Sequence, residues 1–295
     1  MSANAEAASE ARVRLKGITL VSCSIIVWAT GGVFTRLLPF DLWTIVFWRG
    51  LFAAIFIGAY AFYMHGTGIL GKIRNCGLAG AVVALCSCAT IILFPAAFQN
   101  TSVANAFTMV AALPFFTAGF AWIWLSERPS TLTLAASAVA AIGLLIMVGP
   151  YSGGIHSGDL LALLGTLSQA LMVVAARRHP NVAMLPMAWI AVILSVVLAY
   201  PLAGQLWQLS PRDYAVAAGF GLGPMTLGMM LYVIGAARIP AALSALISIA
   251  EAPLGALWAW VGVGEVPSAA TMIGGAIVLV SVGFRVLLER KVHTG

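Results

Sequence analysis

Residues 244–267 read SALISIAEAPLGALWAWVGVGEVP. An apolar run of about 20 residues is what a helix needs to cross the hydrocarbon core of a bilayer, and this run carries a carboxylate, Glu251, near its middle. Similar apolar runs fill most of the 295-residue chain, which has 62% hydrophobic and 8% charged residues. Soluble globular domains carry about 25% charged residues. The sequence therefore predicts an all-α polytopic membrane protein.

Ten apolar spans are expected, separated by short connections that contain proline, glycine or paired polar residues. The spans cover residues 16–37, 42–63, 76–98, 102–125, 131–149, 158–177, 183–203, 213–236, 241–263 and 268–288. We expect residues 1–15 to form a disordered cytoplasmic tail and residues 289–295 a second, shorter tail. No connection has room for a soluble domain, and no Gly-x4-Gly-Lys-Ser/Thr motif is present. The sequence therefore predicts neither a nucleotide-binding domain nor a cofactor or metal site.

Basic residues near the span ends predict the orientation, because cytoplasmic flanks of membrane helices are enriched in Lys and Arg. With the N-terminus inside, only Arg36 and Arg212 lie on the outer side. The inner side holds Arg12, Arg14, Lys16, Lys72, Arg74, Arg128, Arg177, Arg178, Arg238, Arg285, Arg290 and Lys291. This asymmetry predicts that both termini are cytoplasmic, and it explains the net charge of +6 without a nucleic-acid partner.

The end of the opening stretch has a second copy upstream. A shift of 138 residues superimposes three residues of each copy: Trp260 on Trp122, Glu265 on Glu127 and Pro267 on Pro129. Residues 16–149 and 150–288 then form two units of five spans, and because five is odd, the second unit enters the membrane from the opposite side. Inverted repeats are typical of secondary transporters, whose substrate site lies near the midplane between the repeats. Pro114 and Pro253 are one residue out of step, which predicts a one-residue adjustment between the fourth and ninth spans.

Polar and aromatic side chains follow one face of several spans. Ser244, Ser248 and Glu251 lie on one face of the ninth span at helical spacing. Small and hydroxyl residues also serve ordinary helix packing in membranes, but larger polar groups are costly to leave without a partner in lipid. We therefore predict that these three residues bind substrate together with candidates on the other spans, namely Trp28, Thr90, Phe94, Asn105, Thr108, Gln169 and Tyr232.

Glu251 needs a physical explanation, because an ionised carboxylate at the bilayer centre costs about 2.5–3.5 kcal/mol on insertion scales. It can face a wet cavity, carry a proton or pair with a cation. The one cation well inside another span is Arg49. The sequence leaves these three possibilities open.

Two spans lack a polar face. The fifth and tenth spans carry small residues four positions apart, for example Ala136 and Ala140, or Ala270 and Gly274. This spacing predicts close helix packing at the periphery, either within one chain or between two copies. Glu127 and Glu265 are interpreted as helix-end anchors.

An enzyme would need a nucleophile or a second acid–base group in the core. The four histidines (His65, His156, His179 and His293) lie in connections or at ends, and no His-Glu-x2-His or Gly-x-Ser-x-Gly motif occurs. The sequence therefore predicts that the protein is not an enzyme, with an intramembrane enzyme as a distant alternative.

The duplicated ends, WIWLSERP at 122–129 and WVGVGEVP at 260–267, resemble the EamA-type ten-helix members of the drug/metabolite transporter superfamily. Trp28 and the AARIPAA run at 236–242 also resemble this family. The resemblance implies a bacterial inner-membrane exporter of small metabolites that works by alternating access. It places spans one to four and six to nine around a central cavity, with five and ten outside. Within the family the chain is most similar to exporters of amino acids, particularly aromatic ones, which would stack on aromatic side chains.

The sequence thus predicts a secondary exporter of amino acids or similar small metabolites. A drug or nucleotide-sugar carrier of the same fold is the alternative. We expect Asn105, Gln169, Ser244 and Ser248 to hydrogen-bond the substrate, and Glu251 to bind its ammonium group or carry a proton. Membrane lipid and the substrate are the expected partners, and a monomer and a homodimer both remain open.

Overall fold

The computed structural model describes residues 3–100, 109–110, 112–128, 130–148, 157–179, 182–264 and 266–292. Within these ranges every regular element is a helix. Eight helical segments are long and apolar enough to cross a membrane: Arg12–Leu37, Leu42–Met64, Gly77–Ala97, Ser157–Arg178, Met184–Leu202, Pro211–Ala236, Ala241–Val263 and Ala269–Leu288. Two shorter apolar helices, Leu113–Leu125 and Thr131–Met147, lie where the fourth and fifth spans are expected. The all-helical, multi-span architecture is confirmed, while the count of ten and the orientation stay predictions.

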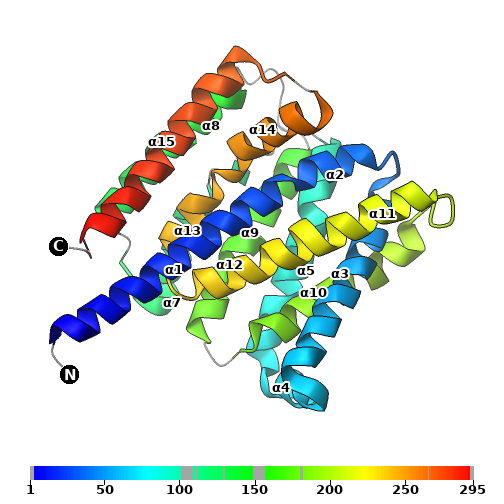
Figure 1. Ribbon diagram of the computed structural model, residues 1–295, viewed down its shortest axis with the longest axis horizontal. Helices are drawn as coiled ribbons and strands as arrows, with labels where there is room; N and C mark the ends of the chain where they lie inside the picture. Colours follow the sequence, from blue (N-terminus) through cyan, green and yellow to red (C-terminus); the bar gives the residue numbers. More distant parts are fainter. Residues whose placement is uncertain are drawn as a thin grey trace.

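The helices pack together as a bundle (Figure 1). In the first half they are α1 (Ala3–Ala29), α2 (Gly31–Leu37), α3 (Leu42–His65), α4 (Ile69–Asn75), α5 (Gly77–Asn100), α7 (Leu113–Leu125) and α8 (Thr131–Val148). In the second half they are α9 (Ser157–Arg178), α10 (Met184–Ala199), α11 (Pro211–Phe220), α12 (Met229–Ala236), α13 (Ala241–Ser248), α14 (Glu251–Val263) and α15 (Ala269–Val292). Short 3-10 turns η1 (Gly66–Gly68) and η2 (Tyr200–Leu202) and a π-helix, η3 (Gly221–Gly228), complete the set.

Helix extends into both of the expected tails, at residues 1–15 and 289–295. The helix α1 begins at Ala3 and α15 continues to Val292. Residues 3–11 are mostly Ala and Glu, which are strong helix formers, so the first span continues outward as helix. The start of α1 and the end of α15 lie at the same end of the bundle (Figure 1), as an even number of spans requires.

The helices α8 and α15 lie along each other at one edge of the molecule (Figure 1). Gly143 and Gly274 face each other, and a Cβ on Gly143 would lie only 2.8 Å from the Gly274 carbonyl oxygen. Ser281 of α15 donates a hydrogen bond of 2.7 Å to the Ala136 carbonyl of α8. The small residues of the fifth and tenth spans therefore serve packing within one chain.

The eighth span is widened in its middle. Pro224 lies inside η3, where its ring cannot coexist with an ordinary α-helical turn and its missing N–H removes a backbone bond. The backbone adopts a π-helical path, and the Thr226 hydroxyl donates to the Gly221 carbonyl five residues back, at 2.7 Å. Such π segments are frequent at functional sites.

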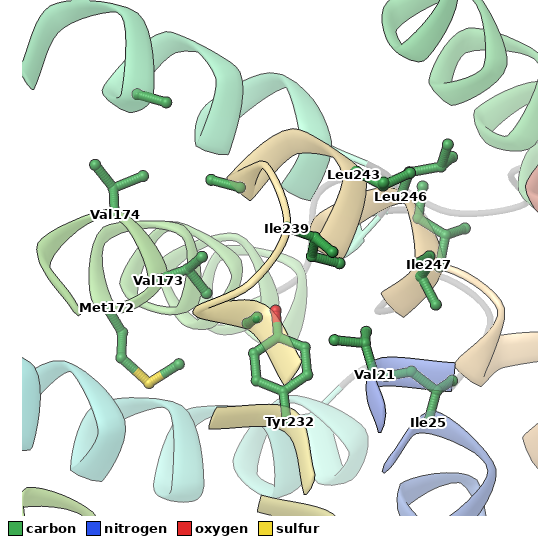
Figure 2. Packing of buried hydrophobic residues seen from close by; sticks show 14 of the residues in the cluster. Val21, Ile25, Met172, Val173, Val174, Tyr232, Ile239, Leu243, Leu246 and Ile247 are labelled. Carbon is green, nitrogen blue, oxygen red and sulfur yellow. The ribbon is translucent and has the colours of Figure 1, made fainter. Parts of the chain in front are cut away.

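The largest buried cluster joins the two halves of the chain (Figure 2). Val21 and Ile25 of α1, Val173 of α9 and Leu246 of α13 belong to it, and all four are less than 5% exposed. Tyr232 of α12 extends into this cluster with its hydroxyl directed inward (Figure 2). This packing holds α1, α9, α12 and α13 around the region described next.

Candidate functional site

A short 3-10 turn breaks the α-helical hydrogen bonding in the middle of the ninth span, and Glu251 lies at this break. The helix α13 ends at Ser248, and α14 begins at Glu251. In between, Ile249 and Ala250 donate their N–H groups three residues back, at 3.2 and 3.1 Å, and not four. Pro253 explains the break, because it has no N–H and its ring opposes an α-helical bond to the Ile249 carbonyl. A stretch of 3-10 geometry in the middle of a helix often marks a functional hinge.

Glu251 differs from its neighbours in exposure. Residues 241–250 are all buried, and so are Ala252 and Pro253, whereas Glu251 is half-buried. No described residue forms a hydrogen bond or an ion pair with its carboxylate. The carboxylate therefore has access to space that protein atoms do not fill.

The ion pair between Glu251 and Arg49, one of the three possibilities that the sequence leaves open, is absent. Arg49 of α3 donates instead from Nη2 to the Ile91 carbonyl oxygen of α5, at 2.9 Å. Its guanidinium carbon lies 5.0 Å from the centre of the Phe220 ring. A wet cavity and a proton remain as the explanations of Glu251.

An aromatic pair lies beside the break. The rings of Trp28 and Tyr232 are 4.9 Å apart, with an interplanar angle of 33°. The indole of Trp28 rests against Gly228, where an added Cβ would lie 2.6 Å from the indole Cδ1. Glycine is needed at position 228 because any side chain there would displace Trp28.

The hydroxyl of Tyr232 is buried next to two serines. The side chain is 2% exposed, and its hydroxyl has no hydrogen-bond partner although Ser244 and Ser248 lie beside it. The hydroxyls of these two serines donate along their own helix, to the Ala241 and Ser244 carbonyls at 2.8 and 2.9 Å. The serine hydrogens are therefore already used, and their oxygens can only accept.

The remaining described candidates lie on α5 and α9, which pack against each other. Thr90 donates its hydroxyl to the Cys86 carbonyl at 2.9 Å. Phe94 packs over Gly165, where an added Cβ would be 3.5 Å from the ring. Gln169 is 7% exposed and has no hydrogen-bond partner among the described residues. Asn105 and Thr108 lie outside the described residues.

The structure thus sorts the predicted residues into two groups. Trp28, Tyr232, Ser244, Ser248 and Glu251 gather where α1, α12, α13 and α14 meet. Thr90, Phe94 and Gln169 belong to the α5–α9 pair. Their assignment to a substrate site stays a prediction.

Two charged residues make contacts that the sequence does not indicate. Arg49 was considered only as a partner for Glu251. Glu127 was interpreted as the end of a span, yet its Oε1 accepts a hydrogen bond from Arg177 Nη2 at 2.7 Å. Arg177 also donates to the Ile239 carbonyl. In the sequence these residues stand out as charges next to apolar spans. A single sequence does not show which residue each of them contacts.

These features define a polytopic α-helical membrane protein with interrupted spans of the kind found in secondary transporters. The chain belongs to the EamA-like transporter family, whose sequence profile matches residues 15–149 and 156–287. It is a multi-pass protein of the bacterial inner membrane, and its family supports a transporter of small metabolites.

Two relatives are described as S-adenosylmethionine uptake transporters. The protein from Rickettsia felis (strain ATCC VR-1525 / URRWXCal2) is 23% identical over 274 residues, covering 87% of this chain and 86% of the relative. The protein from Rickettsia prowazekii (strain Madrid E) is 25% identical over 182 residues, covering 61% and 62%. A solved crystal structure has the same fold, with a TM-score of 0.78 at 19% identity and coverage of 95% of this chain and 99% of the other.

Proposed function

We propose that the protein is a secondary transporter of amino acids or of metabolites that contain an amino-acid group. The observation that carries this proposal is Glu251, a half-buried carboxylate that pairs with no described residue, at the break of the ninth span. A carboxylate in this setting attracts a cationic group, and the ammonium of an amino acid supplies one. S-adenosylmethionine also carries this group, so the described relatives handle a compatible substrate.

The aromatic pair supports the same substrate class. Trp28 and Tyr232 lie beside the half-helix that begins at Glu251. Aromatic rings stack with flat apolar groups and attract cations over their faces. An aromatic side chain, an adenine or a sulfonium would each gain from such a neighbour. A drug or nucleotide-sugar substrate remains the alternative, since stacking alone would serve it equally.

Alternating access would follow from the two-unit architecture. The helices α7 and α14 correspond at the same shift of 138 residues, each is 13 residues long, and each ends in a left-handed residue, Ser126 (φ 55°) or Gly264 (φ 75°). The two prolines lie in the first turns of these helices and remain one residue out of step. Together with the two separate family matches, this correspondence supports inverted repeats that rock around one site.

Counterflow into proteoliposomes tests the proposed function. The purified protein is reconstituted with unlabelled substrate inside, and labelled phenylalanine, methionine or S-adenosylmethionine is offered outside. We expect saturable accumulation of at least one of them and its loss in Glu251→Ala. Running the exchange from either side measures whether the direction is export, as the resemblance implies, or uptake. If none of the three is exchanged while a nucleotide sugar or a cationic drug is, the alternative replaces this proposal.

A further inference from the structure

Arg49 is a buried cation without an anion. It lies in the second span and is 7% exposed. Its Nη2 donates to the Ile91 carbonyl, while its Nε is buried and has no hydrogen-bond partner. No carboxylate among the described residues pairs with it. A carbonyl oxygen and the face of Phe220 neutralise only part of a full positive charge.

The surroundings of Arg49 connect it with the predicted site. Ile91, whose carbonyl it binds, follows Thr90 directly and precedes Phe94 by less than one helical turn. Residues 89–96 of α5 are half-buried throughout, although they lie in the middle of a span. The guanidinium is therefore placed at the part of α5 where the predicted substrate residues lie.

Arg49 and Glu251 lie at different depths along α1 and α2. Phe220, under the Arg49 guanidinium, packs against Gly31, whereas Gly255, one turn after Glu251, faces the Ala29 carbonyl oxygen. The two charges therefore lie beside different residues of this helix pair. Arg49 is opposite in sign to the carboxylate of an amino acid, and Glu251 is opposite in sign to its ammonium group.

We propose that Arg49 binds the carboxylate of the transported substrate, an inference that rests on the proposed function. A guanidinium presents a planar fork of N–H groups that matches both oxygens of a carboxylate. Nε and Nη1 donate to no described residue, so N–H groups remain for the oxygens of a carboxylate. The substrate carboxylate supplies the missing anion, while the substrate cation lies toward Glu251. Solutes that lack a free carboxylate are then poor substrates.

Competition binding tests the role of Arg49 without the complication of membrane-permeant ligands. Labelled phenylalanine, or labelled S-adenosylmethionine if that is the better ligand, is bound to the purified protein in detergent. Unlabelled phenylalanine and phenylalanine methyl ester, which lacks the free carboxylate, compete for the site. In the unmodified protein we expect the free acid to compete at least tenfold better than the ester.

The substitution Arg49→Gln removes the fork, and we expect the preference for the acid over the ester to fall to about one. Arg49→Lys keeps the charge but not the fork, so an intermediate preference is expected, and it serves if the glutamine variant does not fold. Arg178→Gln, an exposed arginine at the end of α9, is the matched control and should keep the full preference.

The two failures are distinguishable. If the unmodified protein binds neither labelled ligand, the proposed function and this inference are both contradicted. If the unmodified protein binds the ligand and both Arg49 variants keep the tenfold preference for the free acid, only the assignment of Arg49 is overturned.

Discussion

The carboxylate of Glu251 is accessible in a stretch whose other side chains are packed, and no described residue neutralises it. An unpaired charge in the bilayer interior persists only where water, a proton or a bound cation compensates it. Arg49 is engaged with Ile91, so among the described residues it does not supply the compensating charge. At the residue scale the mechanism therefore depends on what binds to the two carboxylate oxygens of Glu251.

If Glu251 exchanges protons with substrate, an imposed pH gradient drives transport. We expect proteoliposomes with the unmodified protein to accumulate labelled substrate when a pH gradient is imposed across the membrane. Glu251→Gln should abolish accumulation while leaving exchange at equal pH measurable, because the amide cannot carry the proton. If the unmodified protein ignores the gradient, proton coupling is wrong and facilitated diffusion stands.

Two substitutions of Tyr232 distinguish a role of its hydroxyl in binding from a role of its ring in packing. Its buried hydroxyl forms no hydrogen bond of ordinary geometry with the described residues, although Ser244 and Ser248 lie beside it, and leaving such a group without a good partner costs about 1–3 kcal/mol. Tyr232→Phe should therefore not lower the thermal stability, although it should weaken substrate binding if the hydroxyl waits for a substrate atom. Tyr232→Ala should lower the stability by about 3–5 kcal/mol, because it empties a packed position. Unchanged binding in Tyr232→Phe would assign the ring to packing alone.

At the scale of the elements, prolines decide where helices are interrupted. Pro224 widens the eighth span and Pro253 breaks the ninth, and both interruptions adjoin site residues. The sequence predicted both spans to within a few residues but not their internal breaks. A proline in an apolar run permits a kink, a π segment or a full break, and the packing of neighbouring helices selects among them.

Contacts between the ends of spans also stabilise the arrangement of the helices. Arg177 joins the end of α9 to Glu127 after α7 and to the Ile239 carbonyl before α13. The ion pair is partly exposed, with 23% and 37% of the two side chains accessible, and exposed pairs contribute at most about 1 kcal/mol.

The variant Arg177→Ala loses both contacts, so we expect a loss of about 1–3 kcal/mol. Glu127→Gln, which keeps the carbonyl contact of Arg177, should cost less. Arg178→Ala is the control and should change the stability by less than about 0.5 kcal/mol. Thermal unfolding in detergent compares the three, and equal losses in the Arg177 and Arg178 variants would contradict this assignment.

At the scale of the whole molecule, the α8–α15 pair borders the bundle and is held by backbone contact (Figure 1). Gly274 lies so close to α8 that an added Cβ would be 2.8 Å from the Met147 Cα. Gly274→Leu should therefore separate the two helices and cost about 1–3 kcal/mol from overpacking.

The matched control is Gly283→Leu on the same helix, where an added Cβ meets nothing within 4 Å. Its thermal stability should equal that of the unmodified protein. If Gly283→Leu is destabilised as strongly as Gly274→Leu, the site at position 283 is an interface with a second copy of the chain, which the sequence left open.

The hydrophobic pattern determined the class of protein and the positions of the apolar helices, and the duplicated motifs determined the resemblance to the family. Those properties depend on runs of apolar residues and on local spacing such as Trp-x4-Glu-x-Pro, which a single chain displays directly. The tertiary structure decided which polar groups meet. It placed Trp28 on Tyr232, engaged Arg49 with Ile91 and so left Glu251, in the middle of residues 244–267, without a partner in the described chain. The reason is physical: the partner of a charge depends on distances between helices far apart in sequence, and periodicity within one helix does not contain them.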